Sequence, residues 1–340
     1  LSQKNMTQDF TQIDPVIRQA QDILQKAMGN TSGLTGISTG YNKLDDLTSG
    51  WQDSDLVIIA GRPAMGKTSF ALSLAKNIAV DQRIPLGFFS LEMSKLQLVD
   101  RLISNVCEIN GKAIMNGQLR PDELQRFDKN LHQLEGAPLY IDDTPAMSVF
   151  ELRTKARRMV REKGVRMIMI DYLQLMNASG IRFGNRQEEV STISRSLKGL
   201  AKELNIPVMA LSQLNRTVEN REGYEGKRPQ LSDLRESGAI EQDADMVVFV
   251  HRPEYYGIKT DPKGNDLQGK AEIIIAKHRK GKTDTVLLNF EGQYTRFTNP
   301  EDAALRPLAS DVIDGGGEII GSRINGDDDP LGGDPGAVPF

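Results

Sequence analysis

One eight-residue run constrains the fold of this chain more than any other feature: residues 61–68 read Gly-Arg-Pro-Ala-Met-Gly-Lys-Thr. The run matches the G-x-x-x-x-G-K-[ST] phosphate loop, with an apolar, strand-like segment directly before it and a helix-like segment directly after it. The glycines let the backbone curl so that successive N–H groups point at phosphate oxygens. The sequence therefore predicts a strand–loop–helix unit that binds a nucleotide.

The residue types in this loop fit the chemistry of a triphosphate. The Lys67 ammonium is placed to reach the β- and γ-phosphates, and the Thr68 hydroxyl is placed to ligate Mg²⁺. The N-terminus of the following helix adds a partial positive charge. We therefore expect ATP or another nucleoside triphosphate, with Mg²⁺, as the cofactor. The residues expected to bind it are Gly61, Arg62, Pro63, Ala64, Met65, Gly66, Lys67, Thr68 and Ser69.

A second carboxylate is expected at the end of a neighbouring parallel strand, where it holds the water shell of the metal ion. Two segments offer one. The run 166–171 is strongly apolar and ends at Asp171, which we favour. The run 139–143 ends in Asp142 and Asp143 before a Thr-Pro pair, where acidic residues also fit a turn or a helix cap.

Hydrolysis needs a base that orients the attacking water and a group that senses the γ-phosphate. Glu92 follows the apolar segment 86–90 at its carboxyl end, the edge where ligands collect in open α/β sheets, and it is the candidate base. Gln213, at the end of segment 208–212, is the candidate sensor. The ordinary alternatives are a helix-capping glutamate and a strand-end amide.

Strand-like and helix-like segments alternate from about residue 37 to about residue 297, which predicts an α/β fold with a mainly parallel sheet covered by helices on both faces. The expected strands are 56–60, 86–90, 139–142, 166–171, 208–212 and 245–251. The expected helices are 67–80, 95–105, 121–134, 149–163 and 187–204. Two further strands, 271–279 and 283–290, flank a Lys-Gly-Lys turn and predict a C-terminal β-hairpin.

Lys277 and Arg279 are two residues apart on the first hairpin strand, so their side chains share one face while His278 points to the other. Two cations on one strand face fit a solvated edge that deters aggregation. Alternatively they reach a phosphate bound by a different subunit, and an arginine in that role is worth roughly 10³–10⁵ in rate.

Composition excludes several classes of protein. Of the 340 residues, 39% are hydrophobic and 26% are charged, which rules out a chain that is disordered throughout. Cys107 is the single cysteine, so no intramolecular disulfide forms, and a structural zinc site is not expected. No apolar run approaches the roughly 18 residues that span a bilayer. We expect a cytoplasmic protein without a membrane contact.

The net charge of −4 excludes a uniformly basic nucleic-acid binder but not a local basic patch. The acidity gathers in the Gly-rich residues 309–340, whose seven acids and one arginine leave the remaining residues at about +2. We expect these residues and residues 1–13 to be disordered. Apolar spacing predicts a helix from Asp14 to Met28, a linker to residue 36, and a nucleotide-binding domain over residues 37–308.

Six motifs occur in an order that resembles one family. They are 38–45 (Ser-Thr-Gly-Tyr-Asn-Lys-Leu-Asp), the phosphate loop, 89–93 (Phe-Ser-Leu-Glu-Met), 170–176, 211–216 and 232–238. Over about residues 14–300, the chain is similar to the C-terminal motor domain of the bacterial replicative, DnaB-type DNA helicases. The resemblance implies a RecA-like fold, a homohexameric ring, and ATP-driven 5′-to-3′ translocation on single-stranded DNA that unwinds the duplex at the replication fork.

The resemblance also implies roles for individual residues. Lys277 and Arg279 match a Lys-x-Arg that reaches the nucleotide of the adjacent subunit. Arg235, Glu236 and Gly238 match the loop that grips single-stranded DNA in the ring channel. At the phosphate site it implies Lys67 and Thr68 as phosphate and metal residues, Glu92 as the base, Asp171 as the second metal-side carboxylate and Gln213 as the γ-phosphate relay.

Other parts of the family's assembly are implied as well. The apolar stripe of the helix predicted from Asp14 to Met28 fits packing either on its own domain or on a neighbouring subunit. The resemblance matches it to the linker helix that packs on the neighbouring motor domain. The N-terminal collar domain, which engages primase in the family, does not occur in this sequence, which begins at Leu1 and reads as a fragment or a trimmed chain. We therefore expect primase contact only through that domain, and a helicase loader as a further partner.

Three alternatives remain open. A RecA- or RadA-like recombination ATPase, which forms filaments on DNA, has a similar core, but the motif order and the cations of the hairpin favour the helicase. A small-molecule kinase needs an arginine-rich lid and an acceptor pocket, for which the sequence offers no candidate. A nucleotide switch that never hydrolyses ATP is opposed by the position of Glu92 alone.

Overall fold

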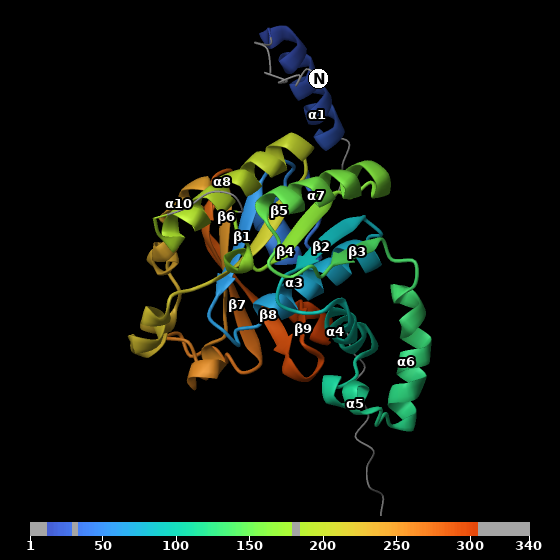
Figure 1. Cartoon of the computed structure of the whole chain (residues 1–340). Helices are drawn as coiled ribbons and strands as arrows, with labels where there is room; N and C mark the ends of the chain where they lie inside the picture. The colour runs from blue at the N-terminus through green and yellow to red at the C-terminus, as the bar shows by residue number, and fades with distance from the viewer. Residues whose placement is uncertain (1–11, 29–32, 179–183, 305–340) are drawn as a thin grey trace, which may run out of the picture. The chain divides into compact units, whose positions relative to one another are not determined.

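The computed structural model describes residues 12–28, 33–178 and 184–304, and it contains a nine-stranded sheet between layers of helices (Figure 1). By its contacts the chain separates into a unit that ends at Ala303 and a second unit, Ala304–Phe340, of which only Ala304 is described. Of the residues expected to be disordered, 1–13 and 309–340, only residues 12 and 13 are described, and Ile13 is the first residue of α1. The division into linker helix, motor domain and tail stays a prediction.

The strand order in the sheet is β3-β2-β4-β5-β1-β6-β7-β8-β9. The first six strands of this order are parallel, and β7, β8 and β9 continue the sheet antiparallel from β6. The mainly parallel sheet and the β7–β8 hairpin predicted from the sequence are confirmed. The strands are β1 (Leu56–Gly61), β2 (Leu86–Ser90), β3 (Leu139–Asp142), β4 (Met167–Asp171), β5 (Val208–Gln213), β6 (Met246–His251), β7 (Lys270–His278), β8 (Asp284–Glu291) and β9 (Arg296–Thr298).

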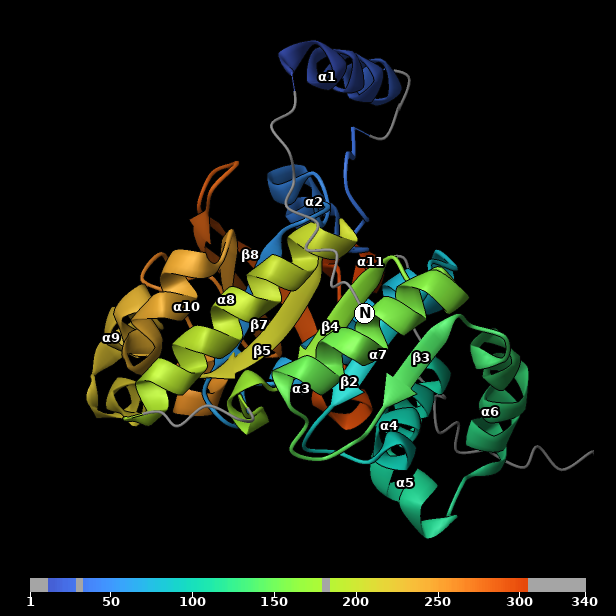
Figure 2. The same cartoon turned by 45° about the horizontal axis from the view of Figure 1, so that its top comes forward.

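Helices cover both faces of the sheet, α7 and α8 on one face and α3 and α4 on the other (Figure 2). None of the helices in the described ranges has the length and apolar character needed to cross a bilayer. The α-helices are α1 (Ile13–Met28), α2 (Asn42–Thr48), α3 (Lys67–Ala75), α4 (Lys95–Cys107), α5 (Gly111–Asn116), α6 (Pro121–Leu134), α7 (Val149–Lys163), α8 (Arg186–Leu204), α9 (Gly223–Lys227), α10 (Gly238–Asp243) and α11 (Pro300–Ala304).

Strand β1 shows why both faces need a cover. All of its residues are buried. Val57 and Ile59 pack in the apolar cluster that includes α3, whereas Leu56 and Ile58 pack in the cluster that includes α7 and α8. Because successive side chains of a strand point to opposite faces, a continuous apolar run makes both faces hydrophobic. The same geometry fixes the phosphate loop, which leaves β1 at its carboxyl end, between the two layers of helices.

Some elements differ from those expected from the sequence. The helix expected over residues 67–80 is α-helical only to Ala75 and continues as a π-helical segment, Lys76–Asp81. Ile78, Ala79 and Val80 stay buried there, so apolar spacing does not separate the two helix types. The short elements α2, α5 and β9 were not predicted, because a strand of three residues shows no alternation and a helix of one or two turns shows little periodicity.

The packing of α8 gives a stability prediction. Leu197 is fully buried between α8 and the sheet. We expect Leu197→Ala to lower the free energy of unfolding by about 2–5 kcal/mol, because the truncation leaves a cavity that the surroundings fill only partly. Lys202→Ala, at an exposed position of the same helix, is the control and changes it by less than about 0.5 kcal/mol. Urea denaturation followed by circular dichroism measures both, and equal values would contradict this packing.

Candidate active site

The loop between β1 and α3 depends on glycine at two positions. Gly66 is the N-cap of α3 and has a φ of +90°, a conformation that side chains disfavour. A Cβ atom there would lie 3.3 Å from Cζ of Phe297. A Cβ atom at Gly61 would lie 2.8 Å from the carbonyl oxygen of Val250. Both glycines of the motif therefore allow a close approach of backbone to neighbouring strands, which fixes the path of the loop.

Lys67 is the first residue of α3 and lies partly buried in the curl of the loop. Its Nζ atom donates hydrogen bonds to the carbonyl oxygens of Gly61 (2.9 Å) and Arg62 (3.4 Å). Burial lowers the pKa of Lys67, and the negative charges of Asp171 and Glu92 oppose this shift. The ammonium is therefore held among backbone carbonyls at the place where an anion binds a phosphate loop.

Thr68 and Asp171 meet beside this lysine. The Thr68 hydroxyl donates a hydrogen bond to Oδ2 of Asp171 (2.8 Å). Asp171 ends β4 and is only 2% exposed. Burial raises its pKa, the hydrogen bond from Thr68 opposes the shift, and the negative charge of Glu92 adds to it. The hydroxyl and the carboxylate form a pair of hard oxygen ligands, as expected for residues that serve a magnesium ion.

Glu92 reaches the same place because β2 and β4 are neighbours. Ser90 is paired with Asp171 across these two strands, and the backbone N–H of Leu91 donates to the carbonyl oxygen of Asp171 (2.7 Å). Ser94, and not Glu92, is the N-cap of α4, where its side chain accepts a hydrogen bond in a capping box. Glu92 therefore does not cap α4, which was the alternative role considered for it, and its side chain is exposed.

Of the predicted binding residues, Gly61, Arg62 and Met65 do not line the pocket of about 500 Å³ at this edge of the sheet. The pocket does bring together Lys67, Thr68, Glu92, Asp171 and Gln213. Four parallel strands supply them, because Lys67 and Thr68 follow β1, Glu92 follows β2, Asp171 ends β4 and Gln213 ends β5. The carboxyl ends of parallel strands meet at one edge of a sheet, so residues more than a hundred positions apart converge there. The lining residues are Pro63, Ala64, Gly66, Lys67, Thr68, Ser69, Glu92, Arg101, Asp171, Tyr172, Gln213, Phe290 and Thr295.

Several lining residues were not found by sequence reasoning. Arg101, on α4, adds a positive charge that acts on Asp171. Phe290, at the end of β8, stacks under the guanidinium of Arg252, which lies 4.0 Å from the ring centre and donates to the carbonyl oxygen of Ala64 (3.3 Å). These residues carry no local motif. Phe290 enters the site because β8 returns toward the phosphate loop, whereas Arg101 comes from α4 and Arg252 follows the carboxyl end of β6, the parallel neighbour of β1.

The competing acids of β3 lie elsewhere. Asp142 pairs with Lys155 (2.9 Å) and accepts a hydrogen bond from the backbone N–H of Thr144 (3.0 Å). Asp143 accepts a hydrogen bond from the backbone N–H of Lys95 (3.0 Å). Both carboxylates therefore serve a turn and a helix start, and neither lines the pocket.

The two cations of the hairpin lie at the opposite edge of the sheet. Lys277 is paired with Val247 near the start of β6, and the backbone N–H of Arg279 donates to the carbonyl oxygen of Asp245 (2.9 Å). Strand β1 begins at this edge and spans about 17 Å before the phosphate loop, at roughly 3.3 Å per residue. Neither cation therefore lies beside the phosphate loop of its own chain.

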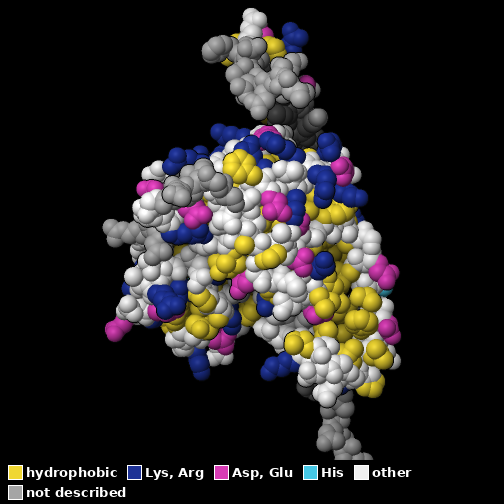
Figure 3. Space-filling view, in the orientation of Figure 1, with side chains coloured by type: hydrophobic (Ala, Val, Ile, Leu, Met, Phe, Trp, Pro, Cys, Tyr) yellow, Lys and Arg dark blue, Asp and Glu magenta, His cyan; other side chains and the backbone are white. Residues whose placement is uncertain are grey.

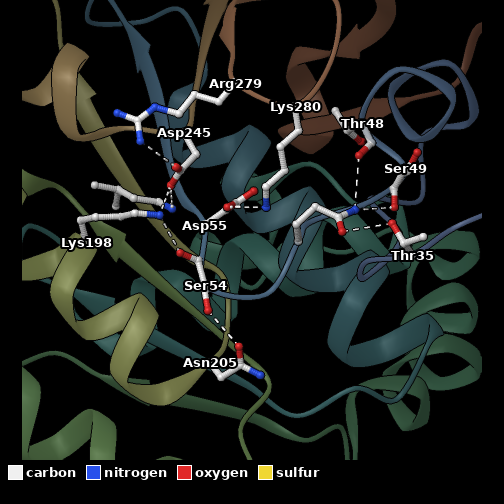
Figure 4. A network of polar contacts seen from close by, with 12 residues as sticks. Thr35, Thr48, Ser49, Ser54, Asp55, Lys198, Asn205, Asp245, Arg279 and Lys280 are labelled. Carbon is white, nitrogen blue, oxygen red and sulfur yellow. Dashed lines mark hydrogen bonds and ion pairs between the residues drawn. The ribbon is translucent and has the colours of Figure 1, made fainter. Parts of the chain in front are cut away.

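A polar network holds Arg279 at this edge (Figure 4). Nη1 of Arg279 donates to Oδ1 of Asp245 (3.3 Å), and the same buried carboxylate pairs with Lys198 of α8. Lys280 pairs with Asp55 (2.8 Å). The Arg279 side chain is nevertheless 47% exposed. The guanidinium is fixed in direction and remains accessible to a neighbouring molecule.

Comparison with known proteins identifies the family. A model of the family described as DnaB-like helicase C terminal domain matches residues 36–299. The chain belongs to this family. It is 46% identical over 301 residues to the replicative DNA helicase DnaB of Geobacillus stearothermophilus, covering 88% of this chain and 64% of that protein. It therefore spans just under two thirds of that relative's length.

Further relatives agree with this assignment. The chain is 44% identical over 313 residues to the replicative DNA helicase DnaC of Bacillus subtilis (strain 168), covering 91% of this chain and 67% of that protein. A solved structure described as the ATPase domain of G40P superposes with a TM-score of 0.77 at 38% identity, over 86% of this chain and 99% of that one. The expected RecA-like fold of the DnaB-type motor domain is confirmed.

In this member of the DnaB-like family, the segment expected to contact DNA follows β5. Arg235, Glu236 and Gly238 lie at the junction of a 3₁₀ segment, Leu231–Ser237, and α10. Their side chains lie outside the described residues. The preceding residues Asp233 and Leu234 are buried, which anchors the segment to the body of the domain.

Proposed function

We propose that this chain is the motor domain of a replicative DNA helicase, which hydrolyses ATP to move 5′-to-3′ along single-stranded DNA and so separates the duplex. One observation carries the proposal: a phosphate-loop lysine, a hydroxyl–carboxylate pair, a strand-end glutamate and a strand-end glutamine from four parallel strands line a single pocket. The relatives at 44–46% identity are replicative DNA helicases, which supports DNA as the polymer on which the motor acts.

The donor set of the pocket fits Mg²⁺, a hard cation that prefers oxygen ligands. In this proposal the Thr68 hydroxyl and the buried Asp171 carboxylate would hold the ion. When bound, the ion neutralises charge on the phosphate oxygens. The raised pKa of Asp171, caused by burial, fits a carboxylate that gains from a nearby cation.

Three further side chains of the pocket have roles in ATP hydrolysis. Lys67 exchanges its backbone carbonyl partners for the β- and γ-phosphate oxygens. Glu92, exposed at the mouth of the pocket, accepts a proton from the attacking water. Gln213 is clamped at its backbone by Gln174, whose amide donates to the Gln213 carbonyl oxygen (3.3 Å), and its side chain responds to the γ-phosphate. Turnover is then linked to the end of β5.

In a ring of identical subunits, cations of one copy can reach the nucleotide pocket of the next. Lys277 and Arg279 are far from their own pocket, so we propose that they complete the pocket of the adjacent copy. A head-to-tail arrangement, in which the amino edge of one sheet meets the carboxyl edge of the next, generates a closed ring when the rotation closes. Six copies are the number that the family resemblance implies.

Two apolar surfaces support this assembly. Apolar side chains gather on the face that carries α4, α5 and α6 (yellow in Figure 3), and α1 also exposes apolar side chains. We propose that α1 of one copy packs on the α4–α6 face of its neighbour. The exposed residues are Ile13, Ile17 and Leu24 on α1, and Leu96, Val99, Met115 and Leu124 on the other face.

Contacts with primase or a helicase loader, and a place at the replication fork, stay predictions.

Single-strand binding gives the next prediction. We propose that Arg235 contacts the DNA backbone, with Glu236 and Gly238 in the same loop. Arg235→Ala is expected to weaken oligonucleotide binding and to reduce the slope of log affinity against log salt by about 0.7 for each phosphate that the arginine neutralises. Arg161→Ala, an exposed arginine on α7, is the control. Fluorescence anisotropy over a salt series measures both, and an unchanged slope in Arg235→Ala would contradict the DNA contact.

Strand separation distinguishes the proposed function from its alternative. A helicase releases the labelled strand of a forked duplex when ATP is added, and it requires a single-stranded tail of one polarity. A recombination ATPase would instead pair a single strand with a homologous duplex. Release from a 5′-tailed fork supports the proposal, and homologous pairing without release would overturn it.

A further inference from the structure

Arg62 belongs to the phosphate loop but directs its side chain to another part of the chain. Nη1 donates to the carbonyl oxygen of Leu214 (2.8 Å), Nε donates to Oε1 of Glu219 (3.0 Å), and Nη2 pairs with the same carboxylate. The Arg62 side chain is only 7% exposed. One guanidinium therefore ties the phosphate loop to two points of the segment that follows β5.

The backbone adds a second tie between these elements. The carbonyl oxygen of Gly61 accepts a hydrogen bond from the backbone N–H of Leu214 (3.4 Å) and another from Nζ of Lys67 (2.9 Å). When the lysine turns toward a phosphate, it leaves an oxygen that it shares with Leu214. A change at the phosphate site therefore alters the contacts of residue 214 directly.

From residue 214 the contacts continue to the segment expected to bind DNA. The backbone N–H of Asn215 donates to the carbonyl oxygen of Asp233 (3.2 Å). The Asp233 carboxylate accepts from Arg221 (2.7 Å) and from the backbone N–H of Gln230 (2.7 Å). Asp233 is buried and stands two residues before Arg235. A chain of polar contacts thus runs from the phosphate loop to the start of the DNA segment.

We propose that the Arg62–Glu219 ion pair couples nucleotide binding to single-strand binding. Arg62 and Glu219 are positioning residues, and what binds at the two ends rests on the proposed function. Coupling between two sites is reciprocal, so nucleotide changes the affinity for DNA by the same factor as DNA changes the affinity for nucleotide. The Glu219 carboxylate is 47% exposed, so water weakens the salt bridge. We therefore expect a coupling factor near the lower end of the usual range, about fivefold.

The test uses the 340-residue chain with a change on the Glu219 side of the pair. Glu219→Gln keeps the shape and removes the charge, and Glu219→Asp keeps the charge on a shorter arm. Glu222→Gln, an exposed glutamate three residues on and outside these contacts, is the control. The dissociation constant of a labelled oligo-dT is measured with and without a non-hydrolysable ATP analogue. ATP turnover is measured with and without unlabelled oligo-dT.

The quantity compared is the ratio of the dissociation constants of oligo-dT measured without and with the ATP analogue. We expect the same ratio in the unmodified chain and in Glu222→Gln. In Glu219→Gln we expect this ratio to fall about fivefold and stimulation of ATP turnover by oligo-dT to fall with it. ATP turnover of Glu219→Gln without DNA is expected to stay within about twofold of that of the unmodified chain, because Glu219 does not line the nucleotide pocket. Glu219→Asp is expected to lie between Glu219→Gln and the control.

The contrary outcomes are distinct. If Glu219→Gln keeps the ratio of the control, the coupling through this pair is wrong while the proposed function stands. If turnover without DNA falls as far as turnover with DNA, or if Glu219→Gln fails to fold and Glu219→Asp behaves as the control, the pair is structural and the inference is wrong. If the unmodified chain binds no oligo-dT, the proposed function fails and the inference fails with it.

Discussion

We expect Lys67→Ala to lower ATP turnover by about 10²–10³-fold or more, because Lys67 is the one lysine among the described residues that line the nucleotide pocket. The lysine is partly buried and carries a pKa lowered by burial, so its charge acts in surroundings where water screens little. Turnover is measured by phosphate release, and nucleotide binding by a fluorescent ATP analogue.

The matched control is Lys76→Ala. Lys76 lies in the π-helical segment that continues α3, and its ammonium pairs with Asp81 (2.8 Å) outside the pocket. This variant is expected to keep turnover near that of the unmodified chain. Thermal unfolding of both proteins distinguishes weaker phosphate binding from a failure to fold. Normal turnover in a folded Lys67→Ala would remove the basis for the phosphate site.

Arg279→Ala is expected to lower turnover by about 10³-fold, the lower end of the range for an arginine that stabilises the charge of a transferring phosphoryl group. Mixing this variant with Glu92→Ala tests where the arginine acts. If it acts on the adjacent copy, a pocket has both groups when the chain that supplies the glutamate is Arg279→Ala and the neighbour that supplies the arginine is Glu92→Ala, whereas the reverse order lacks both. Random mixing in equal amounts then restores about a quarter of the normal turnover, since a head-to-tail ring forms its pockets between neighbours.

The opposite result is equally clear. If Arg279 served only its own chain, every pocket in the mixture would lack one of the two groups, and mixing would restore nothing. Lys280→Ala is the control, because Lys280 follows Arg279, pairs with Asp55 and belongs to the same network. Its turnover is expected to stay near normal. A decrease as large as that of Arg279→Ala would indicate that the network itself is needed, and not the guanidinium.

Local pattern predicted most of the site because the fold places strand ends together. Lys67 and Thr68 follow from a motif within eight residues. Asp171 and Glu92 follow from apolar runs that end in an acid, combined with the rule that ligands gather at the carboxyl edge of a parallel sheet. The strand Leu86–Ser90 has the predicted bounds, and a proline precedes it.

The remaining parts depend on contacts between distant segments. Arg62 and Glu219 are 157 residues apart, and nothing near either one indicates the other. Arg252 follows β6, the parallel neighbour of β1, and Phe290 reaches the phosphate loop because β8 returns antiparallel beside β7, a pairing whose register no local pattern fixes. The surroundings of Arg235, Glu236 and Gly238 are not described, so the roles of these residues remain predictions.

The separation between the phosphate loop and Arg279 has a consequence for an isolated copy. If Arg279 acts on the adjacent copy as proposed, an isolated chain has the means to bind nucleotide but lacks a complete centre for hydrolysis. ATP consumption then rises steeply with protein concentration, as neighbours become available to fill the gap. Dilution of the protein is then expected to lower ATP turnover without unfolding the chain.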